Sequence, residues 1–297
     1  MGHGSYTSAD WSKLKSSRKI TDTSDEGNLF EKKTLDPKYD PKYVAFRESR
    51  DSEDHPDSTP IIIGLDVTGS MGYLASQIAK EGLHETMMKL FSTKPVNDPQ
   101  LMFSAIGDVT DQAPLQVTQF ESDIRIAQQL LDLWLEGCGG DGPEDYPLLW
   151  YFAANHTVAD RFEKRHQKGY LFTIGDADAH PTLEKKHLEA IFNDESKTLT
   201  IEEVARKASQ KYELFHIHIT SHLDEIPTVL NRAIPGRVIR MMKNQISTLP
   251  ELIVSTLMLF EGRSREEVLR SWSKNVRAVV EESLKDLVVS TDEGVSF

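Results

Sequence analysis

The sequence has almost no cysteine, no long hydrophobic run and no excess of basic residues. Its single cysteine, Cys138, excludes an internal disulfide framework and any zinc module built from several cysteines. No stretch approaches the roughly 18 consecutive apolar residues that a membrane-spanning helix needs. The N-terminus also lacks the apolar region of a secretory signal. We therefore expect a cytoplasmic protein with no membrane partner.

Acidic residues outnumber basic ones. Among 297 residues, 47 Asp and Glu stand against 34 Lys and Arg, which gives a formal net charge of −13. The excess is concentrated between Leu101 and Asp160, where ten acidic residues accompany one basic residue, Arg125. A nucleic-acid partner is not expected, because phosphate contacts need clustered Lys and Arg. Two interpretations stay open: a solvated acidic surface, or carboxylates that bind a cation.

The chain divides into a polar arm, one large domain and a helical tail. Residues 1–58 are rich in Ser, Thr, Asp, Lys and Pro and predict an extended or partly disordered arm, with Trp11, Phe30 and Phe46 as candidate anchors that dock it on the domain. Residues 59–262 form the domain. A capping box and an apolar stripe over 263–290 predict one long amphipathic helix, and 291–297 a short tail.

Within the domain, short apolar runs alternate with amphipathic segments. This alternation predicts a Rossmann-like, doubly wound α/β fold, whose mostly parallel six-stranded sheet carries helices on both faces. We expect a further helix to begin near Pro143, after a glycine-rich loop. The expected strands are 61–65, 101–106, 115–120, 169–174, 214–220 and 237–242, and the other expected helices are 71–91, 123–135, 183–193, 200–211 and 249–260.

Carboxylates and hydroxyls follow the predicted strands at the points where the strands end. Ligands of open parallel sheets bind beyond the carboxyl ends of the strands, so these side chains are expected to meet at one edge. Donor sets made only of oxygen select a hard cation, Mg²⁺ first and Mn²⁺ or Ca²⁺ behind it. The residues concerned are Asp66, Thr68, Ser70, Asp108, Asp141, Glu144, Asp145 and Asp176. Each hydroxyl or carboxylate alone would be explained equally well as a helix cap.

The segment Asp66-Val67-Thr68-Gly69-Ser70-Met71, placed after an apolar strand, resembles the start of a von Willebrand factor A (vWA) domain. That family has a metal-ion-dependent adhesion site built from D-x-S-x-S, a later Thr and an Asp after the fourth strand. The resemblance covers about residues 60–260 and implies Asp66, Thr68, Ser70 and Asp176 as metal ligands.

The glycine-rich loop departs from the usual family pattern. Gly139-Gly140-Asp141-Gly142-Pro143-Glu144-Asp145 places Glu144 where most members have Thr, and this version is similar to a branch of the family found in bacteria and alongside alpha-kinases. Glu144 then becomes a ligand, and Asp108 and Asp141 become outer candidates. Surplus negative charge would repel an acidic partner ligand. The resemblance implies a non-enzymatic, metal-dependent adaptor in a multiprotein assembly, for example beside an AAA+ ATPase.

Enzymatic interpretations were weighed against this one. A serine hydrolase would use Ser70 as nucleophile, with Asp176 and either His218 or His222 in α/β-hydrolase order. It leaves Asp66 without a role, and Thr68 stands where the turn needs a small residue. An aspartyl-phosphate phosphatase lacks its second Asp, because Thr68 occupies that position. A dimetal phosphoesterase would combine Asp108, Asp176, His180, His216 and His218, but no Gly-Asn-His segment supports it.

Overall fold

The computed structural model describes residues 4–21, 24, 29–69, 71–78, 82–137, 142–194 and 197–289. Its centre is a six-stranded sheet in the order β10-β9-β6-β2-β3-β4. Neighbouring strands are parallel except for the edge strand β4, which is antiparallel to β3. The strands are β2 Thr59–Asp66, β3 Pro99–Ile106, β4 Leu115–Val117, β6 Gly169–Gly175, β9 Tyr212–Thr220 and β10 Val238–Met242. This sheet confirms the predicted α/β class.

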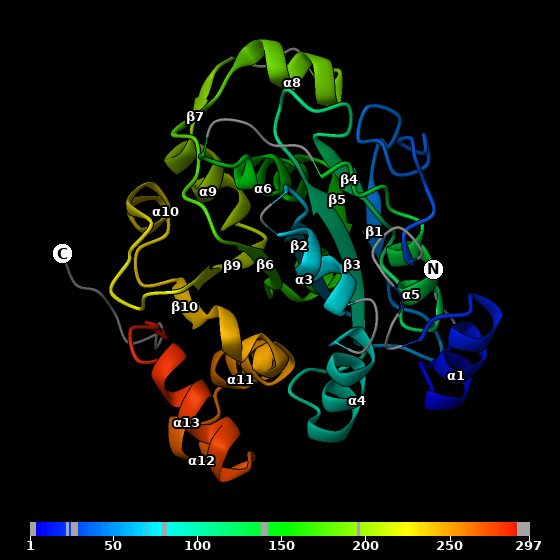
Figure 1. Ribbon diagram of the computed structural model, residues 1–297, viewed down its shortest axis with the longest axis vertical. Coiled ribbons are helices and arrows are strands. Elements are labelled where there is room, and N and C mark those ends of the chain that lie inside the picture. The colour runs from blue at the N-terminus through cyan, green and yellow to red at the C-terminus, as the bar shows by residue number, and fades with distance from the viewer. Residues whose placement is uncertain are drawn as a thin grey trace.

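Helices cover both faces of the sheet (Figure 1). Every residue of β2 is buried, and successive side chains enter opposite cores: Ile61 and Ile63 pack in one, Ile62 in the other. The first core includes side chains of α4 Leu83–Thr93, α5 Arg125–Leu131 and α11 Leu249–Phe260. The second includes side chains of α6 Tyr146–Asn155, α8 Lys185–Phe192, α9 Ile201–Ala208 and α10 Thr228–Ala233.

Helix α6 lies very close to the sheet because β2 carries a glycine at the contact. A Cβ on Gly64 would lie 2.2 Å from Leu149 Cδ2 and 2.8 Å from Ile106 Cδ1. Almost the whole of α6 is buried. It begins at Tyr146 rather than near Pro143 as predicted, so Glu144 and Asp145 stay in the preceding loop, at the carboxyl edge of the sheet.

The N-terminal arm packs against the domain in its described part, which differs from the extended arm that we predicted. It contains α1 Ser8–Ser17, capped by Thr7, and the short strand β1 Arg47–Ser49, which pairs with β5 Thr157–Ala159. Trp11 is buried and stacks on His84 at 5.8 Å, and Phe30 is buried in the same core. The third predicted anchor, Phe46, is 55% exposed. These few aromatic side chains hold the arm even though its composition is polar.

The C-terminal segment is two helices, α12 Arg265–Arg270 and α13 Lys274–Ser283, and not the single long helix that we predicted. The capping box at Ser264 and Glu267 is present. The break falls at Ser271–Ser273, where extended backbone at Ser273 starts the second helix and Trp272 Nε1 donates to Ser255 Oγ at 2.7 Å. Both helices lie beside α11 (Figure 1).

Smaller elements complete the described chain. Within the helix predicted over 71–91 the structure has α3 Gly72–Gln77 and α4, with residues 79–81 outside the described residues, and the strand predicted over 115–120 ends at Val117. No helix in these described ranges is long and apolar enough to span a membrane. The remaining elements are α7 Asp160–Arg165, β7 Thr182–Leu183, β8 Leu199–Thr200 and the 3-10 helix η2 Lys243–Thr248.

Candidate metal site at the carboxyl edge of the sheet

Three neighbouring strands deliver acidic residues to one edge. Asp66 is the last residue of β2, Asp176 directly follows β6, and Asp108 comes two residues after β3. Because these strands are parallel and adjacent, their carboxyl ends lie together. β2 is also the point at which the chain changes direction across the sheet, with β3 on one side and β6 on the other. Ligand sites of open α/β sheets form at such points.

Asp66 is fully buried, and hydrogen bonds reach both of its carboxylate oxygens. Oδ1 accepts from Thr68 N at 2.9 Å and from Thr68 Oγ1 at 2.6 Å. Oδ2 accepts from Tyr146 OH at 2.8 Å. Burial, with a smaller contribution from the charge of Asp176, raises the pKa of Asp66 to about 6 against the opposing effect of the hydrogen bonds from Thr68 and Tyr146. The carboxylate is therefore held in one orientation.

The bond between Tyr146 and Asp66 requires a glycine on the neighbouring strand. A Cβ on Gly175 would lie 2.0 Å from Tyr146 Oη and 2.7 Å from Asp66 Oδ2. The Tyr146 ring also packs on His216, with ring centroids 4.7 Å apart. Sequence reasoning did not identify Tyr146, because it occupies an apolar helix where an aromatic side chain is expected for packing alone.

Glu144 is the least satisfied carboxylate at this edge. Its side chain is 7% exposed, and its Oε2 is buried without a hydrogen-bond partner. Burial first, and then the charges of Asp66, Asp108 and Asp145, together raise its pKa to about 8, and the nearby Thr68 opposes this rise. Among the described residues, no Lys or Arg forms an ion pair with Asp66, Asp108 or Glu144. A buried anion without a compensating charge is costly, and a bound cation removes that cost.

The donors that can be placed suit a hard divalent cation. Asp66, Thr68, Glu144 and Asp176 all offer oxygen, the donor that Mg²⁺ prefers. The charge of Asp176, which is half-buried, affects both Asp66 and Tyr73. Two predicted members, Ser70 and Asp141, lie outside the described residues. Hence the arrangement of the complete predicted set stays a prediction.

A second group of donors lies beside the first. Among the described residues, Asp108, Asp145 and His180 offer ligand atoms that all lie within 4.8 Å of one another. Asp66, Glu144 and Asp176 do not form a group that close in the same part of the chain. We predicted Asp108 as an outer member of the Asp66 set, whereas the structure groups it with Asp145 and His180.

From the sequence, Asp145 is predicted only as one of the oxygen donors of the edge and His180 only as part of the dimetal phosphoesterase, and the meeting of the two residues is not predicted. The positions of both residues in the sequence already place them near the predicted strand ends. Asp145 belongs to the acidic loop, and His180 follows the Gly175-Asp176 pair by four positions. Their meeting depends on how two loops pair, which no local pattern specifies.

The histidines of the enzymatic interpretations occupy or follow β9. His216 and His218 share one face of this strand, with ring centroids 5.9 Å apart. His216 Nδ1 is 3.0 Å from Thr173 Oγ1, and His218 Nδ1 is buried without a partner. His222 is exposed beyond the strand. The charge of Asp176 acts on His218, and the proposed nucleophile Ser70 lies outside the described residues, so the hydrolase triad stays a prediction.

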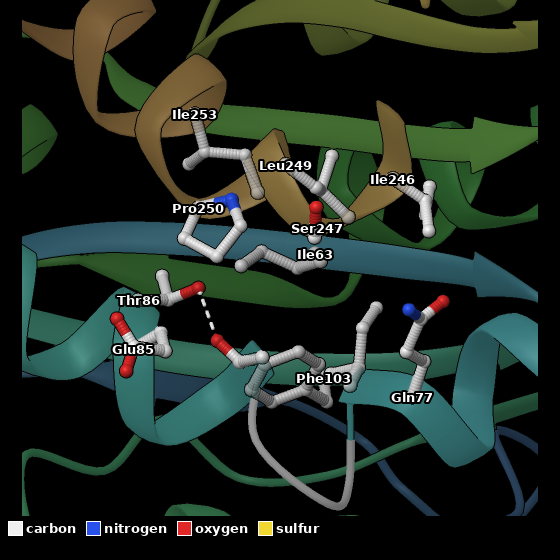
Figure 2. A pocket seen from close by; sticks show the side chains of 12 residues that line it. Ile63, Gln77, Glu85, Thr86, Phe103, Ile246, Ser247, Leu249, Pro250 and Ile253 are labelled. Carbon is white, nitrogen blue, oxygen red and sulfur yellow. Dashed lines mark hydrogen bonds between the residues drawn. The ribbon is translucent and has the colours of Figure 1, made fainter. Parts of the chain in front are cut away.

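An apolar pocket lies away from these strand ends. It has a volume of about 100 Å³ and lies between α4 and the start of α11, over β2 and β3. Figure 2 shows Ile63 and Phe103 at its base and Leu249, Pro250 and Ile253 opposite α4. Its lining offers no cluster of metal ligands. The chemistry of the edge and the apolar pocket are therefore separate features.

No family model and no curated protein matches the chain. Solved structures similar to it include the pilus adhesin SpaC from Lactobacillus rhamnosus GG in its open conformation, at 7% identity and a TM-score of 0.46, covering 71% of this chain and 31% of that one. Proximal thread matrix protein 1 from the mussel byssus, with a zinc-occupied MIDAS motif, is similar at 12% identity and a TM-score of 0.46, covering 68% and 48%.

The VWA domain of SpRpn10 is similar at 14% identity and a TM-score of 0.41, covering 65% of this chain and 94% of that domain. The match therefore spans about a third of SpaC and about half of the thread matrix protein. Structures similar to this chain thus include a VWA domain and a protein with a MIDAS motif, and the chain itself has an α/β fold with a six-stranded, mostly parallel sheet.

Proposed function

We propose that this protein is a non-enzymatic, vWA-type interaction module that binds a divalent cation at the Asp66 site and another protein at the same edge of the sheet. The Asp66 site is defined as Asp66, Thr68, Ser70, Glu144 and Asp176. The observation that carries the proposal is the buried Oε2 of Glu144, which has no hydrogen-bond partner, and the carboxyl group of this residue is affected by the charge of Asp66. A buried oxygen without a hydrogen-bond partner is a candidate cation ligand, because buried polar atoms normally have a bonding partner.

The donor set favours Mg²⁺, with Mn²⁺ and Ca²⁺ as weaker candidates. Carboxylate and hydroxyl oxygens bind hard cations, and Mg²⁺ is usually held by few carboxylates and several waters. When bound, the cation would neutralise carboxylates that now repel one another. Thr68 and Tyr146 would keep Asp66 oriented toward it, because their hydrogen bonds fix both carboxylate oxygens.

The same charge count restricts the partner. With Asp66, Glu144 and Asp176 around one dication, negative charge exceeds positive charge. An acidic side chain from a partner would add to this excess, so a neutral or basic partner group fits better. We propose an adaptor role in a multiprotein assembly, for which an AAA+ ATPase is one candidate. A cytoplasmic location is part of the same proposal.

Thermal unfolding with Mg²⁺ and with EDTA tests the cation. We expect Mg²⁺ to raise the melting temperature of the wild-type protein and the Asp66→Ala, Ser70→Ala double variant to lose this response. Glu266→Gln on α12 is the control, because Glu266 is exposed, lies outside the predicted ligand set and forms an ion pair with its neighbour Arg270. A wild-type melting temperature that is the same with Mg²⁺ and with EDTA would contradict the proposal.

Affinity capture tests the partner. The full chain is used as bait with Mg²⁺ and, in parallel, with EDTA, and recovered proteins are compared. We expect at least one protein to be recovered with Mg²⁺ and lost with EDTA and with the double variant. Labelling of Ser70 by a fluorophosphonate probe would instead favour the serine hydrolase and overturn the non-enzymatic assignment.

A further inference from the structure

We propose that Asp108, Asp145 and His180 form a second cation site, separate from the Asp66 site, that takes a borderline transition metal of the Zn²⁺ type. We call these three residues the His180 cluster. Their ligand atoms lie within 4.8 Å of one another. A cation with bonds of about 2.1 Å holds tetrahedral ligands roughly 3.4 Å apart, so only small side-chain rotations are needed to close the set.

Three separate loops hold the cluster together. The loop after β3 carries Asp108, and Val109 N of this loop donates to Asp145 Oδ2 at 2.9 Å. The loop before α6 is joined to the loop after β6 by Glu144 N donating to Asp178 O at 2.8 Å and His180 N donating to Glu144 O at 3.2 Å. These backbone bonds fix the positions of Asp145 and His180 relative to each other.

The donor chemistry differs from that of the Asp66 site. The His180 cluster combines one imidazole nitrogen with two carboxylates, whereas the Asp66 site offers oxygen alone. Imidazole suits Zn²⁺ and its neighbours among the transition metals, while oxygen-only sets suit Mg²⁺. Asp108 and Asp145 are 3% and 2% exposed, and His180 is half-buried, so the cluster is enclosed on its carboxylate side and open beside the histidine.

A second observation, which also bears on the Asp66 site, points to a cation at this edge. Glu144 is more than nine-tenths buried, and its Oε2 has no hydrogen-bond partner. It adjoins Asp145 in the chain, and its backbone bonds to His180. Its carboxyl group is affected by the charges of Asp108 and Asp145 as well as by that of Asp66.

The two sites have distinguishable ligands. Both Asp66 oxygens already accept hydrogen bonds from Thr68 and Tyr146, and Asp66 is not a member of the close group. Asp108 Oδ1 accepts from Thr110 N at 2.7 Å and from Thr110 Oγ1 at 2.6 Å, so its orientation is set within its own loop. A substitution at His180 should therefore leave the Asp66 site intact.

Calorimetric titration of the metal-free full chain with Zn²⁺, in excess Mg²⁺, tests the second site. We expect one Zn²⁺ site in the wild-type protein and an affinity at least tenfold lower in His180→Ala. The exposed His222 provides the control variant His222→Ala, which should bind Zn²⁺ as the wild-type protein does. Asp66→Ala should lose the Mg²⁺ response and keep Zn²⁺ binding, so the failure of either site is seen separately.

Two further measurements make the outcome unambiguous. Co²⁺ replaces Zn²⁺ as a spectroscopic probe, and we expect its visible absorption to change between wild type and His180→Ala, because one nitrogen ligand is lost. Asp145→Asn, of similar shape, should weaken Zn²⁺ binding in the same way. Equal Zn²⁺ affinity in wild type and His180→Ala, or loss of Zn²⁺ binding in Asp66→Ala, would overturn the proposal. The proposal would also be overturned if His180→Ala lowered the free energy of unfolding by the same amount with and without Zn²⁺. His180 would then be an ion-pair partner and not a metal ligand.

Discussion

Tyr146 donates a hydrogen bond of 2.8 Å to Asp66 across the gap between helix α6 and strand β2. Both residues are fully buried, and they are separated by 80 positions in the chain. The bond ties the first helix after the acidic loop to the first strand of the sheet. It therefore links the loop that carries Glu144 to the carboxylate that we propose as a metal ligand.

Tyr146→Phe should weaken both the fold and the proposed cation site. The substitution leaves Asp66 Oδ2 without its donor, and losing a hydrogen bond to a charged group costs about 1.5–3 kcal/mol. We expect a lower free energy of unfolding in urea and a smaller Mg²⁺-induced rise in melting temperature. Tyr43→Phe, at a residue that is 68% exposed, is the matched control and should change neither. Unchanged stability of Tyr146→Phe would mean that the bond contributes little.

Gly175→Ala should be strongly destabilising. Its Cβ would come within 2.0 Å of Tyr146 Oη, so the tyrosine must move and lose Asp66. Overpacking of this kind costs typically about 1–3 kcal/mol, and the lost hydrogen bond adds to it. Gly82→Ala is the comparison, because a Cβ there meets nothing closer than 3.5 Å. Similar melting temperatures for the two variants would count against the close approach.

Glu144→Gln should stabilise the metal-free protein and reduce its response to Mg²⁺. Folding raises the pKa of Glu144 to about 8, which costs stability at neutral pH because the carboxyl is ionised in the unfolded chain, and Gln keeps the shape of the side chain without this cost. We expect a melting temperature in EDTA at least about 2 °C above wild type. In Mg²⁺ the melting temperature of the wild-type protein should equal or exceed that of Glu144→Gln. A variant less stable than wild type in EDTA would show that Glu144 is satisfied without a cation.

Asp51 should contribute stability that depends on pH. Burial alone would raise its pKa, but hydrogen bonds and charge from Arg165, with bonds from Ser58, together hold its pKa well below the usual range. Arg165 Nη1 lies 2.8 Å from Asp51 Oδ2, and Ser58 Oγ donates to Oδ1 at 2.7 Å. A carboxyl whose pKa is lowered by folding stabilises the protein above its unfolded pKa of about 3.9 and loses this contribution as pH falls further.

Urea unfolding of wild type and Asp51→Asn at several pH values measures this contribution. The difference in free energy of unfolding should be largest at neutral pH and shrink as the pH falls below about 4. The exposed Asp54 provides the control, and Asp54→Asn should show a small difference throughout. A difference for Asp51→Asn that does not vary with pH would assign the effect to packing.

Much of the fold was predictable because its signals are local. The apolar run at Ile61–Leu65, buried on both faces, identifies a central strand by its composition alone. The capping box at Ser264 likewise marks a helix start. The helix break at Ser273 was missed because the apolar stripe continues across it, and the folded arm was missed because its anchors are few and widely spaced.

The sequence by itself determined that oxygen-bearing side chains gather after parallel strands, since strand order along the chain and the direction of parallel strands place Asp66, Asp108 and Asp176 at one edge. Only the tertiary structure decided which of them meet. Tyr146 reaches Asp66 from 80 positions away, and Asp145 reaches the loop of Asp108 from 36 positions away. Contacts at such separations depend on how closely α6 approaches β2 and on how two loops pair, and hydrophobic periodicity carries no information about either.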